Sequence, residues 1–117
     1  MTNETNSTAD TTAAILDRLF EVIESRRDGD SDASYTAKLL ARGTPKIAQK
    51  VGEEAVETVI EAMKADGGKL AEESADLLYH LLVLWADKGV RPDAVWGVLA
   101  ERFGISGIEE KNSRKKD

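Results

Sequence analysis

Two short acidic motifs contain the residues best suited to chemistry. Glu54 and Glu57 are three residues apart, and so are Glu73 and Asp76. Residues at i and i+3 on a helix are neighbours, with β-carbons about 5–6 Å apart. Two such pairs that face each other across a helical hairpin could give oxygen ligands to Mg²⁺, with water and substrate phosphate filling the remaining positions. The alternative is that both pairs lie on solvated helix faces and make ordinary ion pairs.

The second acidic pair lies on a segment that is apolar on nearly all sides. From residue 77 to residue 86, His80 is the only strongly polar side chain. Such a helix should be buried, so Glu73 and Asp76 are expected to face an interior or a cleft. Removing ionised groups from water costs several kcal/mol each unless they are paired or bind a metal. A metal ion is therefore the expected counterion, and His80 is expected to be a core or supporting residue rather than a ligand.

Four basic residues precede the acidic motifs at intervals of four: Lys38, Arg42, Lys46 and Lys50. They suit a polyphosphate bridged by a metal, because phosphate oxygens that the metal does not hold need Arg or Lys. The alternative is charge balance at helix ends. Gly67 and Gly68 lack the surrounding pattern of a phosphate-binding loop, so binding by metal and side chains is expected.

The elements that must position these residues are predicted to be helices. Apolar residues recur at helical spacing, and no alternating pattern is long enough to build a sheet. We expect about five helices, at about 10–26, 34–42, 44–65, 69–88 and 91–104, with Asp10 and Thr44 as N-caps. The break at 66–68 predicts that the third and fourth helices are antiparallel, with Glu57 level with Asp76. Trp85, Trp96 and Phe103 are expected in the core.

Length and composition limit the remaining possibilities. The 117 residues predict one helical domain at 10–105, between a disordered tail at 1–9 and a polar tail at 106–117. The helix at 69–88 has more apolar surface than one partner helix could cover, which predicts a homodimer. A net charge of −6 argues against nucleic acid as a partner. The chain has no cysteine and one histidine, which leaves hard oxygen ligands for a hard cation.

No segment is predicted to span or enter a membrane. The longest apolar run is about half the roughly 20 residues that a spanning helix needs. Residues 1–10 contain neither Lys nor Arg and no apolar core, unlike a secretory signal. We therefore expect a cytoplasmic protein.

The combined motifs resemble a known enzyme family. The matching residues are Ser34 to Thr36, Gly43, Lys46, Ile47, Lys50, Gly52 to Glu57, Glu73 to His80 and Ser106 to Lys111. This pattern is similar to that of the phosphoribosyl-ATP pyrophosphatases, which belong to the MazG-like all-α NTP pyrophosphohydrolases. The resemblance covers about residues 16–114. It implies Mg²⁺-dependent hydrolysis of phosphoribosyl-ATP to phosphoribosyl-AMP and pyrophosphate, the second step of histidine biosynthesis.

The same resemblance implies roles for individual residues. It implies that Glu54, Glu57, Glu73 and Asp76 bind the metal and that Lys38, Arg42, Lys46 and Lys50 contact phosphates. Glu53 is a candidate for a further ligand or for the base that orients water, a role that Glu57 could share. Two alternatives remain open at this point: a house-cleaning pyrophosphatase of the same superfamily acting on NTPs or dNTPs, and a non-catalytic helical dimerisation module.

Overall fold

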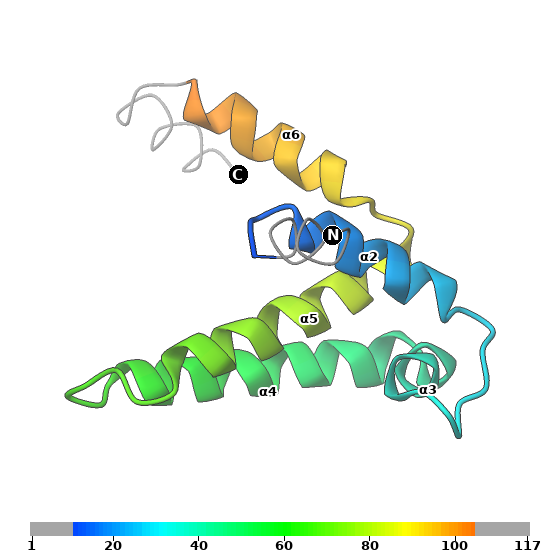
Figure 1. The fold of residues 1–117 in the computed structure, drawn as a ribbon, viewed down its shortest axis with the longest axis horizontal. Helices are drawn as coiled ribbons and strands as arrows, with labels where there is room; N and C mark the ends of the chain where they lie inside the picture. The colour runs from blue at the N-terminus through cyan, green and yellow to red at the C-terminus, as the bar shows by residue number, and fades with distance from the viewer. Residues whose placement is uncertain (1–10, 105–117) are drawn as a thin grey trace, which may run out of the picture.

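The computed structural model describes residues 11–104, and within this range it contains five helices and no strand (Figure 1). The helices are α2 (Ile15–Ser25), α3 (Tyr35–Arg42), α4 (Thr44–Ala62), α5 (Leu70–Lys88) and α6 (Pro92–Phe103). The all-α prediction with about five helices is confirmed. The predicted tails at 1–9 and 106–117 and the predicted N-cap Asp10 lie outside the described residues.

Helices α4 and α5 form the antiparallel hairpin that positions the acidic motifs. At one end, the Thr44 hydroxyl donates to the Asp87 carboxylate, and near the turn Glu61 Oε1 accepts the Lys69 N–H at 2.9 Å. These contacts join the start of α4 to the end of α5 and the end of α4 to the residue before α5. The predicted antiparallel arrangement is confirmed.

Two details of the hairpin differ from the prediction. Thr44 is not the N-cap: Gly43, which has no side chain to make a capping hydrogen bond, holds that position, and the Thr44 hydroxyl bonds to Asp87 on α5. Helix α4 ends at Ala62 rather than near residue 65. The longer connection, 63–69, is closed by the Glu61 contact and by Gly67 and Gly68, whose φ angles are +78° and +49°. The turn is therefore organised from α4 as well as by its glycines.

The core forms where α2, α3 and α4 pack against α5 (Figure 1). Its fully buried apolar residues are Phe20, Ile23, Leu39, Ile47, Leu82, Val83 and Ala86. The predicted burial of the apolar helix is confirmed for the second half of α5, which also contains the buried His80. Helices α2, α3 and α4 of the same chain cover this half of α5, so its apolar side chains are buried without a second chain.

A sharp corner joins α3 to α4. The Ser34 side chain caps α3 by accepting the Ala37 N–H at 3.2 Å. The helix stops at Gly43, as predicted, but with φ +91° and ψ 179° rather than in the left-handed helical region. Pro45 follows as the second residue of α4. Residues with basic side chains therefore flank a corner that fixes their relative positions.

The apolar side chains left exposed lie mainly on α4 and α6. On α4 and at its C-cap they are Val56, Val59, Ile60 and Met63, and on α6 they are Val98, Leu99 and Phe103. The predicted core position of Phe103 is wrong, since its side chain is 92% exposed at the end of a helix that packs on α2. Trp96 and Trp85 are half-buried and contact each other edge to face. None of the described helices combines the length and apolar character required to cross a membrane.

Candidate metal and phosphate site

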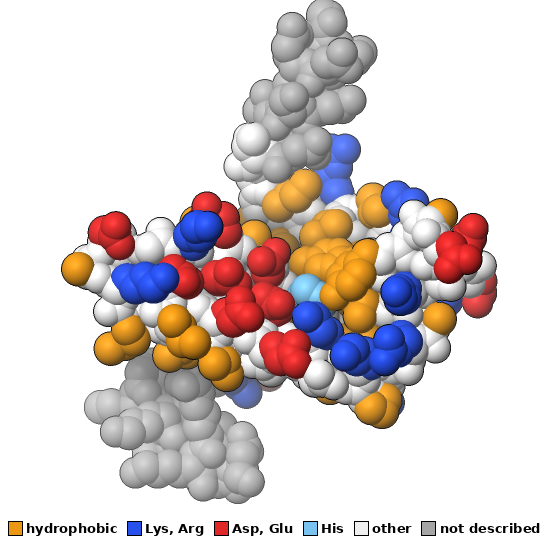
Figure 2. Space-filling view, turned by 90° about the horizontal axis from the view of Figure 1, so that it is seen from below, with side chains coloured by type: hydrophobic (Ala, Val, Ile, Leu, Met, Phe, Trp, Pro, Cys, Tyr) orange, Lys and Arg blue, Asp and Glu red, His pale blue; other side chains and the backbone are white. Residues whose placement is uncertain are grey.

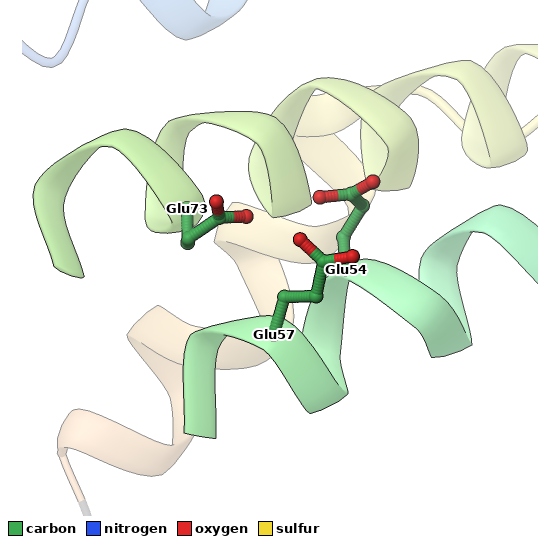
Figure 3. Close-up of side chains that lie close together, drawn as sticks. All are labelled: Glu54, Glu57 and Glu73. Atoms are coloured by element: carbon green, nitrogen blue, oxygen red, sulfur yellow. The ribbon is translucent and has the colours of Figure 1, made fainter. Parts of the chain in front are cut away.

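Three carboxylates from the two helices of the hairpin converge. Carboxylate oxygens of Glu54, Glu57 and Glu73 all lie within 4.8 Å of one another. Figure 3 shows Glu54 and Glu57 rising from α4 toward Glu73 on α5. The i, i+3 spacing places the first two on one side of α4, and the hairpin brings the third to them. We call these three residues the carboxylate group.

Asp76 lies beside the carboxylate group but is not part of it. Its side chain is exposed, and its oxygens are not among those that lie within 4.8 Å of one another. The reason is the register of the hairpin: the Thr58 hydroxyl reaches the Glu73 carbonyl at 3.3 Å, so Glu57 lies near Glu73 rather than level with Asp76. Asp76 is still close enough to raise the pKa of Glu73. Its role as a ligand stays a prediction.

Glu73 experiences the strongest electrostatic conflict of the group. Loss of solvation raises the pKa of Glu73, and repulsion from Glu57, Asp76 and Glu54 raises it further. Its Oε1 atom is buried and, alone among the buried side-chain nitrogen and oxygen atoms of residues 11–104, makes no hydrogen bond. Such an atom is costly unless a ligand satisfies it. Three clustered oxygen donors with one buried oxygen unsatisfied fit a hard divalent cation such as Mg²⁺.

Lys50 partly neutralises the outer side of this group. Its Nζ lies 3.3 Å from Glu53 Oε1 and 3.9 Å from Glu54 Oε2. Glu53 also accepts a hydrogen bond from Gln49 Nε2 at 2.8 Å. The hydrogen bond from Gln49 and then that from Lys50 lower the pKa of Glu53, which makes it a weaker proton acceptor. Glu53 therefore lies at the edge of the carboxylate group, bonded to α4 neighbours.

The four basic residues predicted to contact phosphate line one pocket. Lys38, Arg42, Lys46 and Lys50 surround a cavity of about 220 Å³ together with Tyr35 and Leu39. We call this cavity the basic pocket. Figure 2 shows basic side chains close to the acidic ones on the same face of the molecule, with the single histidine at the border of the acidic cluster. Lys50 lines the basic pocket and lies 3.9 Å from Glu54 Oε2, so the basic pocket and the carboxylate group are adjacent.

Two features of the site were not predicted. Thr58 lies one turn after Glu54, and its hydroxyl is shared between the carbonyl oxygens of Glu54, at 2.8 Å, and Glu73, at 3.3 Å. It therefore ties the two helices together at the level of the carboxylate group. The second feature is the hydrogen bond of 3.1 Å between the Tyr35 hydroxyl and His80 Nε2. The sequence signal for Thr58 was its position on the same side of α4 as Glu54, whereas nothing in the spacing paired Tyr35 with His80.

Comparison with known proteins identifies the family. The family model described as phosphoribosyl-ATP pyrophosphohydrolase matches residues 16–103. This chain belongs to that family. A protein named phosphoribosyl-ATP pyrophosphatase from Azospirillum brasilense is 65% identical over 103 residues, which are 88% of this chain and 93% of the relative. One of the same name from Paramagnetospirillum magneticum is 63% identical over 102 residues, 87% of this chain and 94% of the relative.

Membership of the phosphoribosyl-ATP pyrophosphohydrolase family confirms the resemblance inferred from the motifs. The matched range contains all five described helices except the first residue of α2, together with the carboxylate group and the basic pocket. It does not include residues 106–111, on which part of the resemblance rested.

Proposed function

We propose that this chain is a cytoplasmic, Mg²⁺-dependent enzyme that hydrolyses phosphoribosyl-ATP to phosphoribosyl-AMP and pyrophosphate, in histidine biosynthesis. The observation that carries the proposal is the adjacency of the carboxylate group and the basic pocket, which Lys50 connects by its contact with Glu54. A metal-bound polyphosphate has matching chemistry, since its cation suits the carboxylates and its free oxygens suit Lys and Arg. The names of the relatives support this particular substrate.

The residues divide the work between two ends of the site. Glu54, Glu57 and Glu73 would hold Mg²⁺, with Asp76 available at the edge, and the ion would supply charge neutralisation and Lewis acidity toward phosphoryl oxygens. Lys38, Arg42, Lys46 and Lys50 would bind the phosphate oxygens and stabilise the charge that develops on the leaving pyrophosphate.

Hydrolysis breaks the phosphoanhydride bond between the α and β phosphates, so a water molecule must attack one of these two phosphorus atoms, and a carboxylate must orient it. Glu57 is exposed to solvent within the carboxylate group, where a water molecule can reach it. Glu53 is the second candidate, but its lowered pKa makes it the weaker proton acceptor. We therefore assign the orientation of water to Glu57 and a supporting position beside Lys50 to Glu53.

We also propose a homodimer, in which a second chain covers the exposed apolar face of α4. Val56, Val59, Ile60 and Met63 are each more than half exposed. A groove next to this face is lined by Glu53 and Glu57 as well as by Val56 and Ile60, so dimerisation would also enclose one side of the site. Sedimentation at micromolar concentration tests this, and Val59→Glu should yield a folded monomer. A monomeric wild type would contradict the dimer.

The activity is tested by incubating the purified protein with phosphoribosyl-ATP and Mg²⁺ and identifying the products. We expect equal amounts of phosphoribosyl-AMP and pyrophosphate. A parallel set of NTPs and dNTPs separates the alternatives: turnover of dNTPs without turnover of phosphoribosyl-ATP would indicate a house-cleaning enzyme. Turnover of none of these nucleotides would leave the dimerisation module as the better interpretation.

A further inference from the structure

An aromatic group at the wall of the basic pocket is left without a role by the chemistry above. Tyr35 lines the pocket and is 52% exposed, while His80, behind it, is only 6% exposed. The Tyr35 ring stacks on Tyr79 with a centroid distance of 6.2 Å and an interplanar angle of 25°. His80 contacts both tyrosine rings edge to face. A half-exposed ring is thus supported from the protein side by two others.

Hydrogen bonds define how His80 holds Tyr35. His80 Nδ1 lies 2.8 Å from the Asp76 backbone carbonyl oxygen, which can only accept, so Nδ1 carries a hydrogen. In the neutral ring, Nε2 then has a free lone pair and accepts the Tyr35 hydroxyl hydrogen at 3.1 Å. The chain of bonds runs from the Asp76 turn of α5 to the first residue of α3. It links the helix that carries Glu73 to the wall of the basic pocket.

The other pocket residues indicate what Tyr35 would contact. Four of the six lining side chains are cations suited to phosphate, and Leu39 is buried in the core. Tyr35 is the only described lining residue with an aromatic face. Aromatic side chains bind bases by stacking, because every base has a π-face. The chemistry of the pocket therefore pairs its cations with phosphates and Tyr35 with the nucleobase.

We propose that Tyr35 binds the nucleobase of the substrate by stacking and that His80 is a positioning residue that holds Tyr35 through its hydroxyl. This inference rests on the proposed function for the identity of the full substrate, but its central claim concerns any adenine nucleotide in this pocket. His80 acts by restricting the exposed Tyr35 ring to one orientation, which reduces the conformational entropy that is lost when the ligand binds.

The test compares two ligands that share phosphates and differ in the base. Affinities of each variant for α,β-methylene-ATP and for inorganic triphosphate are measured by calorimetry with Mg²⁺. Base stacking is worth about 1–3 kcal/mol, so Tyr35→Leu should lower the affinity for the nucleotide roughly five- to a hundredfold. The affinity for triphosphate should change less than about twofold, and the KM for phosphoribosyl-ATP should rise more than kcat falls.

Positioning by His80 is tested by a double-mutant cycle. Tyr35→Phe keeps the ring and removes only the hydroxyl, and His80→Asn alters the acceptor. Each change should weaken nucleotide binding several-fold. The double variant should bind the nucleotide no more weakly than the single variant with the lower affinity. Tyr79→Phe is the matched control, because it removes a hydroxyl that bonds to Thr36 in the same cluster. We expect less than about a twofold change for it.

Several outcomes would overturn the inference. These are equal losses of nucleotide and triphosphate affinity in Tyr35→Leu, no loss of either, or a wild type that does not prefer the nucleotide. Additive effects of Tyr35→Phe and His80→Asn would remove the positioning role. These measurements follow the binding of α,β-methylene-ATP and inorganic triphosphate and do not depend on hydrolysis of phosphoribosyl-ATP. If the activity assay fails but the preference for the nucleotide over triphosphate is intact, the proposed substrate is refuted and the role of Tyr35 is not.

Discussion

The carboxylate group and the basic pocket are adjacent, but they are assembled in opposite ways. The carboxylate group joins residues from two helices and gathers three like charges within 4.8 Å, with a buried oxygen left unsatisfied. The basic pocket takes its cations from the successive helices α3 and α4 around one corner; Lys38 and Arg42 are exposed, and Lys46 and Lys50 are half-buried. The first region is destabilised until a cation binds, whereas the second stays hydrated and stable without a ligand.

This difference indicates how the site selects a ligand. Binding of Mg²⁺ should mainly increase the stability of the folded protein, because the ion removes repulsion between carboxylates that the fold holds close together. Variants of the basic pocket should mainly change the affinity for phosphate groups, because the cations of this pocket are separate from one another and already solvated. Variants in the two regions should therefore separate Mg²⁺ binding from substrate binding.

The largest effect is expected from Glu73→Gln. The change removes one ligand from the carboxylate group but keeps the shape of the side chain. Even the hydrogen-bond partners of metal ligands contribute about 10–100-fold, so activity should fall by at least about 100-fold. The unfolding temperature without Mg²⁺ should be equal to or higher than that of the wild type, because a repelling charge is lost.

The control for this variant is Glu72→Gln, which removes the same charge from an exposed neighbour in the first turn of α5. It should keep near wild-type activity. Equal activity in the two variants would contradict the assignment of Glu73 to the site.

In the basic pocket, Arg42→Ala should weaken substrate binding without affecting the metal. Hydrogen bonds to charged groups contribute about 1.5–3 kcal/mol, so the KM for phosphoribosyl-ATP should rise roughly ten- to a hundredfold. The increase in unfolding temperature on adding Mg²⁺ should be retained. Lys88→Ala, at the end of α5 and outside the pocket, is the control. An unchanged KM in Arg42→Ala would remove it from the site.

Much of the site could be predicted because its spacing is local. The i, i+3 pair on α4 and the hairpin break were sufficient to bring Glu54 and Glu57 to Glu73, and a spacing of four residues placed the cations around one corner. The position of Asp76 was less accurate because it depended on counting from the turn. The connection between α4 and α5 spans residues 63–69 rather than the predicted break at 66–68, so the register of the two helices differs from the predicted one.

Other features depend on tertiary contacts that no periodicity reveals. Thr44 looked like an N-cap, but a partner on α5, Asp87, takes its hydroxyl. Phe103 matched the apolar pattern of α6, yet that pattern does not say whether the face it marks meets this chain or another. The bond between Tyr35 and His80 joins residues 45 positions apart and requires knowing how α3 crosses α5.

Stability of the apo protein should depend on pH in a direction set by Glu73. Its pKa is raised above the ordinary value of 4.5, so its contribution is fully favourable below that value and is lost as the pH rises through the folded pKa. Mg²⁺ should offset this loss, by about 2.7 kcal/mol at a hundredfold excess over its Kd. Thermal unfolding with and without Mg²⁺ at several pH values measures both effects. Glu73→Gln should reduce the pH dependence of the unfolding temperature. If Na⁺ at matched ionic strength raised the unfolding temperature as much as Mg²⁺ does, that would argue against a specific site.

The smallest effect is expected at the hairpin turn, where two glycines allow a matched comparison. A β-carbon at Gly68 would lie 2.4 Å from Glu61 Oε1, whereas one at Gly67 would meet no atom within 4 Å. Both residues have positive φ, so alanine at either costs about 1–2 kcal/mol of backbone strain. Gly68→Ala must in addition displace Glu61, whose carboxylate accepts the Lys69 N–H just before α5 begins.

The difference between the two alanine variants therefore isolates the Glu61 contact and its effect on the carboxylate group. That contact, followed by the one with Lys64, lowers the pKa of Glu61, so its contribution is present above pH 4.5 and is lost as the pH falls through the folded pKa. Gly68→Ala should unfold at a lower temperature than Gly67→Ala at neutral pH, and the gap should close in acid. Because Glu73 lies in the first turn of α5, Gly68→Ala should also respond less to Mg²⁺, while its affinity for inorganic triphosphate stays unchanged. Equal behaviour of the two variants would show that the turn glycines alone set the position of α5.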